Sequence, residues 1–146
     1  MILTRRAALA GLLLAVPLRT ATAATAVTLY KDPQCGCCAA YAKILQASGF
    51  TVDIKPTADL AAINLKAGIP EPYGGCHTAF LEGYAVSGHV PLEAIEKLMK
   101  ERPAIAGITL PGMPMGSPGM GGAKTEPFVI YAVPKDGGAP TVFMTL

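Results

Sequence analysis

The sequence has 146 residues, of which 51% are hydrophobic, and a formal net charge of +2. Its length suits one domain built around one hydrophobic core. The near-neutral charge and the lack of a basic run exclude a nucleic-acid-binding surface as its functional feature.

The N-terminal residues 1–23 have the pattern of a secretory signal peptide. A basic start at Arg5–Arg6 precedes an uncharged apolar run over 7–14, and the small residues 21–23 have the spacing that signal peptidase accepts. The apolar run is too short to span a bilayer as a helix, which argues against a retained membrane anchor. The adjacent arginines resemble those of a twin-arginine signal. We therefore expect export to the periplasm, and a single domain over 24–146 that has no membrane contact after cleavage.

Strands are predicted where β-branched and aromatic residues alternate, and helices where apolar residues recur every three or four positions between capping signals. In chain order these are a strand over 26–30, a helix over 38–48, a strand over 51–55, a helix over 57–67 capped by Thr57, strands over 78–81 and 84–86, and a helix over 91–102. The first two strands are joined through a helix, which suits a parallel pair. The order β-α-β-α-β-β-α predicts an α/β fold of the thioredoxin-like type.

The C-terminal part extends this core. Residues 107–124 are rich in Gly, Pro and Met and show no periodicity, so we predict a loop there. Residues 128–133 and 141–145 are predicted to be two late strands that form a hairpin.

The four cysteines are the most informative residues for function. Cys35, Cys37 and Cys38 lie between the first strand and the first helix, where the free N–H groups and dipole of a helix start stabilise thiolates. Cys76 precedes the third strand, which in a thioredoxin-like sheet begins beside that helix start. We therefore expect the four thiols to converge. Two structural disulfides remain an alternative for an exported chain, although the adjacent Cys37 and Cys38 fit that alternative poorly.

Thiolates at this place support two chemistries, metal binding and thiol–disulfide exchange. An oxidoreductase would use Cys35 and Cys38 as a C-x-x-C pair. Thioredoxin-like proteins usually carry a cis-proline before the third strand, and the stretch 75–78 has no proline, which weighs against this enzyme.

The cysteine spacing favours copper(I) over zinc as the metal. Three cysteines within four residues crowd one side of a tetrahedral zinc site, whereas thiolates that bridge several copper(I) ions tolerate such crowding. We therefore expect a multinuclear copper(I) site formed by Cys35, Cys37, Cys38 and Cys76, with zinc, an iron–sulfur cluster and no metal as the alternatives.

Methionine and histidine provide additional soft ligands. Met113 and Met115 form a Met-x-Met pair in the Gly/Pro/Met-rich loop, and their thioethers suit copper(I), although methionines in such a loop also cover apolar surface. His77 directly follows Cys76 and is the favoured imidazole ligand. His89 precedes the third helix, where packing or capping would explain it equally well, so we rank it second.

Several motifs in a fixed order carry a resemblance to a known family. They are Tyr30-Lys31-Asp32-Pro33-x-Cys35-Gly36-Cys37-Cys38, Cys76-His77-Thr78, Gly88-His89-Val90-Pro91, Arg102-Pro103-x-Ile105-Ala106-Gly107 and Pro111-Gly112-Met113-Pro114-x-Gly116-Ser117-Pro118-Gly119-Met120. This set resembles the CopG-type copper-resistance proteins over nearly all of the chain after residue 23. The resemblance implies a thioredoxin-like fold and a thiolate-bridged multinuclear copper(I) cluster on the four cysteines. It also implies a role in periplasmic copper handling coupled to copper redox interconversion, with copper ions and other periplasmic copper-handling proteins as partners.

Overall fold

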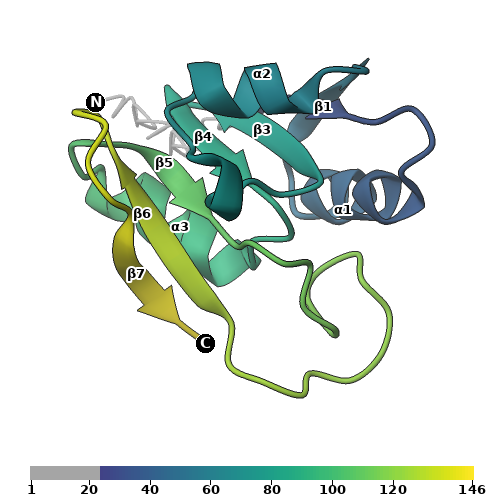
Figure 1. Ribbon diagram of the computed structural model, residues 1–146. Coiled ribbons are helices and arrows are strands. Elements are labelled where there is room, and N and C mark those ends of the chain that lie inside the picture. Colours follow the sequence, from purple (N-terminus) through teal and green to yellow (C-terminus); the bar gives the residue numbers. More distant parts are fainter. Residues whose placement is uncertain (1–23) are drawn as a thin grey trace, which may run out of the picture.

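The structure, a computed structural model, describes residues 24–146 (Figure 1). The predicted signal peptide and its twin-arginine type lie outside these residues. Within the described part of the chain, no helix is long and apolar enough to cross a membrane. The elements, in chain order, are β1 (Ala26–Lys31), α1 (Gly36–Ala47), β2 (Thr51–Pro56), α2 (Leu60–Lys66), a short 3-10 helix η1 (Glu71–Tyr73), β3 (His77–Leu81), β4 (Tyr84–Ser87), α3 (Leu92–Glu101), β5 (Ile105–Thr109), β6 (Val129–Pro134) and β7 (Thr141–Thr145).

The strands form one mixed sheet of seven strands in the order β2-β1-β3-β4-β5-β6-β7. The predicted parallel pairing of β1 with β2 is confirmed, as is the antiparallel β3–β4 hairpin. The sheet continues through a parallel β4–β5 pair and antiparallel β5–β6 and β6–β7 pairs. The predicted β-α-β-α-β-β-α order is therefore observed, with η1 inserted before β3.

The helices cover both faces of the sheet (Figure 1). The larger core lies under α1 and α3, where Tyr41 and Leu45 of α1 pack with Ile95 and Leu98 of α3 against the sheet. The smaller core, built around Ile69, lies on the other face beside α2. The inner strands β3 and β4 are buried on both faces because helices cover both sides of the sheet there, whereas the edge strands β2 and β7 are largely exposed.

One strand was missed by the sequence analysis, which assigned residues from Gly107 onward to a loop. Gly107 lies in the middle of β5. The structure gives a reason for this glycine, because a Cβ atom there would lie 1.9 Å from the carbonyl oxygen of Ala85 on β4. The predicted C-terminal hairpin is confirmed as β6–β7, and β5 joins it to the rest of the sheet.

Two predicted helix starts were wrong. The first helix begins at Gly36 instead of Cys38, so that Cys37 and Cys38 both lie in its first turn. The second helix begins at Leu60, and its capping residue is Asp59, whose side chain accepts a hydrogen bond from the Ala62 N–H. A carboxylate at this position satisfies a free N–H group and interacts favourably with the helix dipole, which the Thr57 hydroxyl further upstream cannot do.

Candidate metal centre

A hydrogen-bonded turn after β1 positions the first cysteine. The backbone N–H of Cys35 donates to the Asp32 carbonyl oxygen at 3.1 Å, and the Asp32 carboxylate accepts from the Gln34 N–H at 2.7 Å. Lys31 is only 6% exposed, and its ammonium group donates to the carbonyl oxygens of Asp32 and Pro33. These bonds hold the turn in place just before α1 begins.

Three of the cysteines occupy the start of α1. Cys35 is the N-cap residue, and its Sγ accepts a hydrogen bond from the Cys38 N–H at 3.3 Å. A sulfur in this position is stabilised by a free helix N–H group and by the positive end of the helix dipole. Cys37 and Cys38 follow in the first turn, and Cys38 is fully buried.

The fourth cysteine comes to the same place from the start of β3. Gly75 packs directly on Gly88, since a Cβ atom on Gly75 would lie 2.3 Å from the Gly88 Cα atom. This close backbone contact sets the position of Cys76. The Sγ atoms of Cys76 and Cys38 are 3.4 Å apart, and the Cys38 Sγ lies 3.2 Å from the Cys76 carbonyl oxygen.

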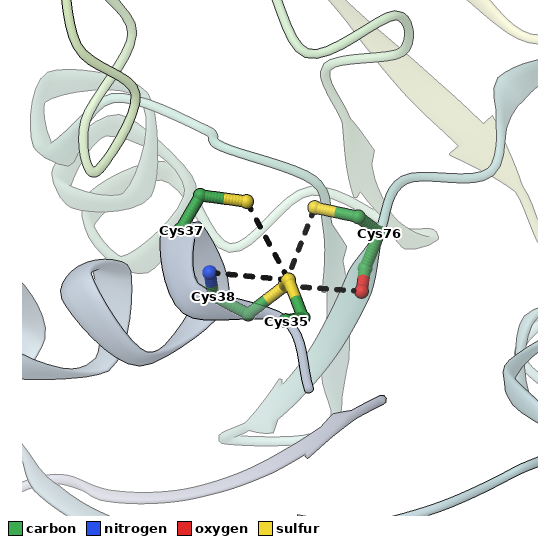
Figure 2. Close-up of side chains that lie close together, drawn as sticks. All are labelled: Cys35, Cys37, Cys38 and Cys76. Atoms are coloured by element: carbon green, nitrogen blue, oxygen red, sulfur yellow. Dashed lines mark hydrogen bonds between the residues drawn. A yellow bond between two sulfur atoms is a disulfide. The ribbon is translucent and has the colours of Figure 1, made fainter. Parts of the chain in front are cut away.

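The four cysteines therefore converge as expected, and Figure 2 shows their side chains pointing toward one another. Their sulfur atoms all lie within 4.8 Å of one another. In the structure Cys35 and Cys38 form a disulfide bond, whereas Cys37 and Cys76 are free thiols. Four sulfur ligands for a metal are consequently available only after this disulfide is reduced.

The surroundings of Cys76 favour its neutral thiol. Burial, together with the neighbouring Cys37, raises the pKa of the Cys76 thiol to about 12. In the metal-free protein Cys76 therefore keeps its proton at neutral pH. A soft metal ion would displace that proton, because metal binding requires the deprotonated ligand.

Two buried histidines flank Cys76, and both are fully shielded from solvent. The Nδ1 atom of His89 lies 2.6 Å from the Pro118 carbonyl oxygen, and because a carbonyl only accepts, Nδ1 carries the proton. The lone pair of His89 Nε2 then faces the Cys76 Sγ at 3.1 Å. His77 Nδ1 lies 3.6 Å from the same sulfur, and His77 Nε2 is buried without a hydrogen-bond partner.

Packing and desolvation keep the two imidazoles neutral. The His77 ring stacks at 4.4 Å from the Tyr41 ring and lies 4.8 Å from the His89 ring. Burial, and secondarily the nearby His89, lowers the pKa of His77 to about 3. Burial also lowers the pKa of His89. Neutral imidazole is the form that binds metals.

The Gly/Pro/Met-rich loop closes one side of the site through its backbone. Besides the Pro118 carbonyl oxygen, the loop contributes Gly119, where a Cβ atom would lie 2.8 Å from both the Cys37 carbonyl oxygen and the Tyr41 nitrogen. The predicted thioether ligands of this loop are exposed, Met113 by 44% and Met115 by 50%.

The structure thus brings together the four cysteines and His77, and it adds His89 with a shorter contact to Cys76. From the sequence alone His89 ranks below His77, because packing or capping before α3 explains its position equally well. The motif Gly88-His89-Val90-Pro91 was the available signal, since Gly88 allows the backbone approach that brings His89 to Cys76.

Comparison with known proteins identifies the family. Two solved structures of a protein named copper resistance protein copG, described as form 2 and form 1, are similar to this chain. Form 2 has 36% sequence identity and a TM-score of 0.77, over 84% of this chain and 98% of that chain. Form 1 has 37% identity and a TM-score of 0.75, over 83% and 96% of the two chains. The chain belongs to the CopG family of copper resistance proteins.

A family model described as a protein of unknown function, DUF411, matches residues 73–120, a range that holds Cys76, both histidines and the first part of the loop. No curated protein matches the sequence. Membership in CopG, together with a cysteine cluster that could hold a metal ion, supports a copper-related role.

Proposed function

We propose that this CopG-family protein binds copper(I) in a multinuclear thiolate cluster and acts in copper resistance. The observation that carries the proposal is the convergence of four cysteine sulfurs within 4.8 Å at one helix start. Sulfur and neutral imidazole are soft to borderline ligands that suit copper(I), and thiolates bridge several such ions readily. The hard carboxylate ligands that magnesium and calcium prefer are not part of this cluster.

The proposed ligands would have different roles in the site. Cys35, Cys37, Cys38 and Cys76 would form the cluster. His77 and His89 would serve as auxiliary ligands, and the lone pair that faces Cys76 favours His89. Met113 and Met115 would be thioether ligands on the exposed side of the loop. They would contribute less to copper affinity than the buried thiolates.

We also propose a thioredoxin-like core and a periplasmic location. The strand order β2-β1-β3-β4, with β1 parallel to β2 and antiparallel to β3, supports the first proposal. The signal-like pattern of the N-terminal residues supports the second. Copper ions, and other copper-handling proteins of the periplasm, would be the partners.

The decisive experiment is an anaerobic copper(I) titration of the reduced protein, lacking residues 1–23, against a chromogenic chelator. We expect several copper ions per chain, and far fewer in Cys37→Ser, which loses one bridging sulfur. The protein with its Cys35–Cys38 disulfide intact is the matched control and should bind fewer ions than the reduced protein. A reduced protein that cannot compete with the chelator, or that prefers zinc, would refute the proposal.

A second function is favoured by the Cys35–Cys38 disulfide itself. Two thiols of this pair could reduce two copper(II) ions to copper(I), giving one disulfide and two protons, which would be the redox interconversion of copper. The same pair could instead exchange with a disulfide of another protein. Reduction of insulin by the metal-free dithiol form would support disulfide exchange, whereas reduction of copper(II) without insulin reduction would support the copper reaction.

A further inference from the structure

A buried polar residue lies on the side of the sheet opposite α1, and the four-cysteine cluster does not explain its presence there. Asn64 lies on α2 and is only 7% exposed. A buried amide is unfavourable unless it is hydrogen bonded. Its Oδ1 atom accepts a hydrogen bond from the hydroxyl of Thr78, which is fully buried on β3 two residues after Cys76.

The hydrogen bonds continue from Thr78 to the backbone on both sides of Cys76. Thr78 and Ser87 are cross-strand partners, both fully buried, and their hydroxyl oxygens lie 3.2 Å apart. The Ser87 oxygen accepts a hydrogen bond from the Gly75 N–H at 2.9 Å, and its hydroxyl lies 3.4 Å from the His77 carbonyl oxygen. Gly75 and His77 are the two neighbours of Cys76.

Asn64 also lies against the chain that leads to Cys76. A Cβ atom on Gly74 would be only 2.9 Å from Asn64 Nδ2, so this glycine is in close contact with the amide. Asn64 also lines a cavity of about 390 Å³ between α2 and the segment before β3. The hydrogen bond from Thr78 and the close contact with Gly74 hold the amide against residues 74–78.

We propose that Asn64, Thr78 and Ser87 form a positioning network that sets the place of the Cys76 sulfur relative to the other three cysteines. This inference rests on the proposed copper function and adds positioning residues that do not touch the metal. Hydrogen-bond partners that orient metal ligands commonly change metal affinity by about 10- to 100-fold when they are removed. A role in fold stability alone would give no such specific effect on the site.

The test compares two substitutions of one hydroxyl. Thr78→Val keeps the shape of the side chain and removes its hydrogen bonds, whereas Thr78→Ser keeps the hydroxyl. We expect Thr78→Val to lower copper(I) affinity, measured by chelator competition, by about tenfold with an unchanged number of bound ions. Thr78→Ser should restore most of the affinity. Val27→Ala is the stability control, because Val27 is buried near the start of β1, away from the end of this strand that leads to Cys35.

A second measurement reports on Cys76 without copper. In a protein whose other three cysteines are replaced by serine, the alkylation rate of Cys76 should rise severalfold with Thr78→Val and with Asn64→Leu. It should stay unchanged with Val27→Ala. If wild-type protein binds no copper, the proposed function fails while the alkylation rates still test the network. Equal changes in Thr78→Val and Val27→Ala, or no change in Thr78→Val, would overturn the inference.

Discussion

Two walls bound the site, and they are built in different ways. The cysteine wall, Cys35–Cys38 with Cys76, consists of side chains held at the start of α1 and at the start of β3. The loop wall, residues 111–124, has no helix or strand. It reaches the site through backbone atoms, namely the Pro118 carbonyl oxygen and the Gly119 backbone.

The loop wall is nevertheless internally ordered by hydrogen bonds. Ser117 is almost fully buried, and its hydroxyl donates to the Pro114 carbonyl oxygen at 2.7 Å. Gly116 donates its N–H to the Gly121 carbonyl oxygen at 3.1 Å. In the proposed copper site, the cysteine wall would supply the ligands. The loop wall would orient His89 through the Pro118 carbonyl oxygen.

The largest effect is expected from Cys76→Ser in the cysteine wall. Serine retains the shape but replaces a soft sulfur by a hard oxygen, which binds copper(I) poorly. We expect loss of the multinuclear stoichiometry, with no more than about one copper ion retained per chain. Anaerobic titration measures the stoichiometry, and circular dichroism checks the fold. A variant that still binds several ions would show that Cys76 is not a ligand.

The second prediction concerns His77, the buried histidine next to Cys76, in the metal-free protein with its Cys35–Cys38 disulfide intact. His77 has a pKa of about 3 when folded and an ordinary value of 6.5, and it is surrounded by Cys76, His89 and Tyr41. Between these two values the unfolded state binds more protons, so stability is full above about pH 6.5 and falls as the pH decreases. The expected loss from His77 is about 1.4 kcal/mol per pH unit.

Urea unfolding at several pH values between about 7 and 4 measures this slope. Carboxylates also take up protons in this range, so the informative quantity is the difference from His77→Phe, which retains an aromatic ring beside Tyr41. This variant should show a shallower slope. Identical slopes in the two proteins would mean that His77 does not remain neutral in the folded state.

The third prediction tests the contact between the walls. Gly119→Ala places a Cβ atom 2.8 Å from backbone atoms of α1 at a residue whose φ is +85°. Such left-handed backbone and close contact are expected to cost about 1–3 kcal/mol of stability. Gly121→Ala is the matched control, because a Cβ atom there meets nothing within 4 Å. Equal thermal stabilities of the two variants would show that the loop is not packed against α1 in solution.

Much of the fold was predictable because local patterns decide it. Alternating apolar residues predict β1 and β2, and apolar residues that recur every three or four positions predict α3. The strand β5 was missed because Gly107 is required by a contact with Ala85, which is far away in the sequence. Local patterns carry no information about such a contact between neighbouring strands.

In the site, too, local sequence predicts some features, whereas others depend on contacts between residues that are far apart in the chain. The convergence of the cysteines followed from the order of β1, α1 and β3. The short contact between His89 and Cys76 did not, because it depends on the Gly75–Gly88 backbone contact and on Pro118, almost 30 residues further along the chain. The spacing of Cys35 and Cys38 likewise does not determine their oxidation state, since the same spacing occurs in a dithiol and in a disulfide.

The smallest effect is expected from replacing Met113 and Met115 together by leucine. Both side chains are about half exposed, so a copper(I) ion bound to them would remain in contact with water and exchange easily. We expect an unchanged number of bound ions and at most about a twofold loss of affinity in chelator competition. Leucine keeps the apolar volume, and therefore any role in covering the surface is retained. A tenfold loss would make the loop wall a principal source of ligands and would end the distinction between the two walls.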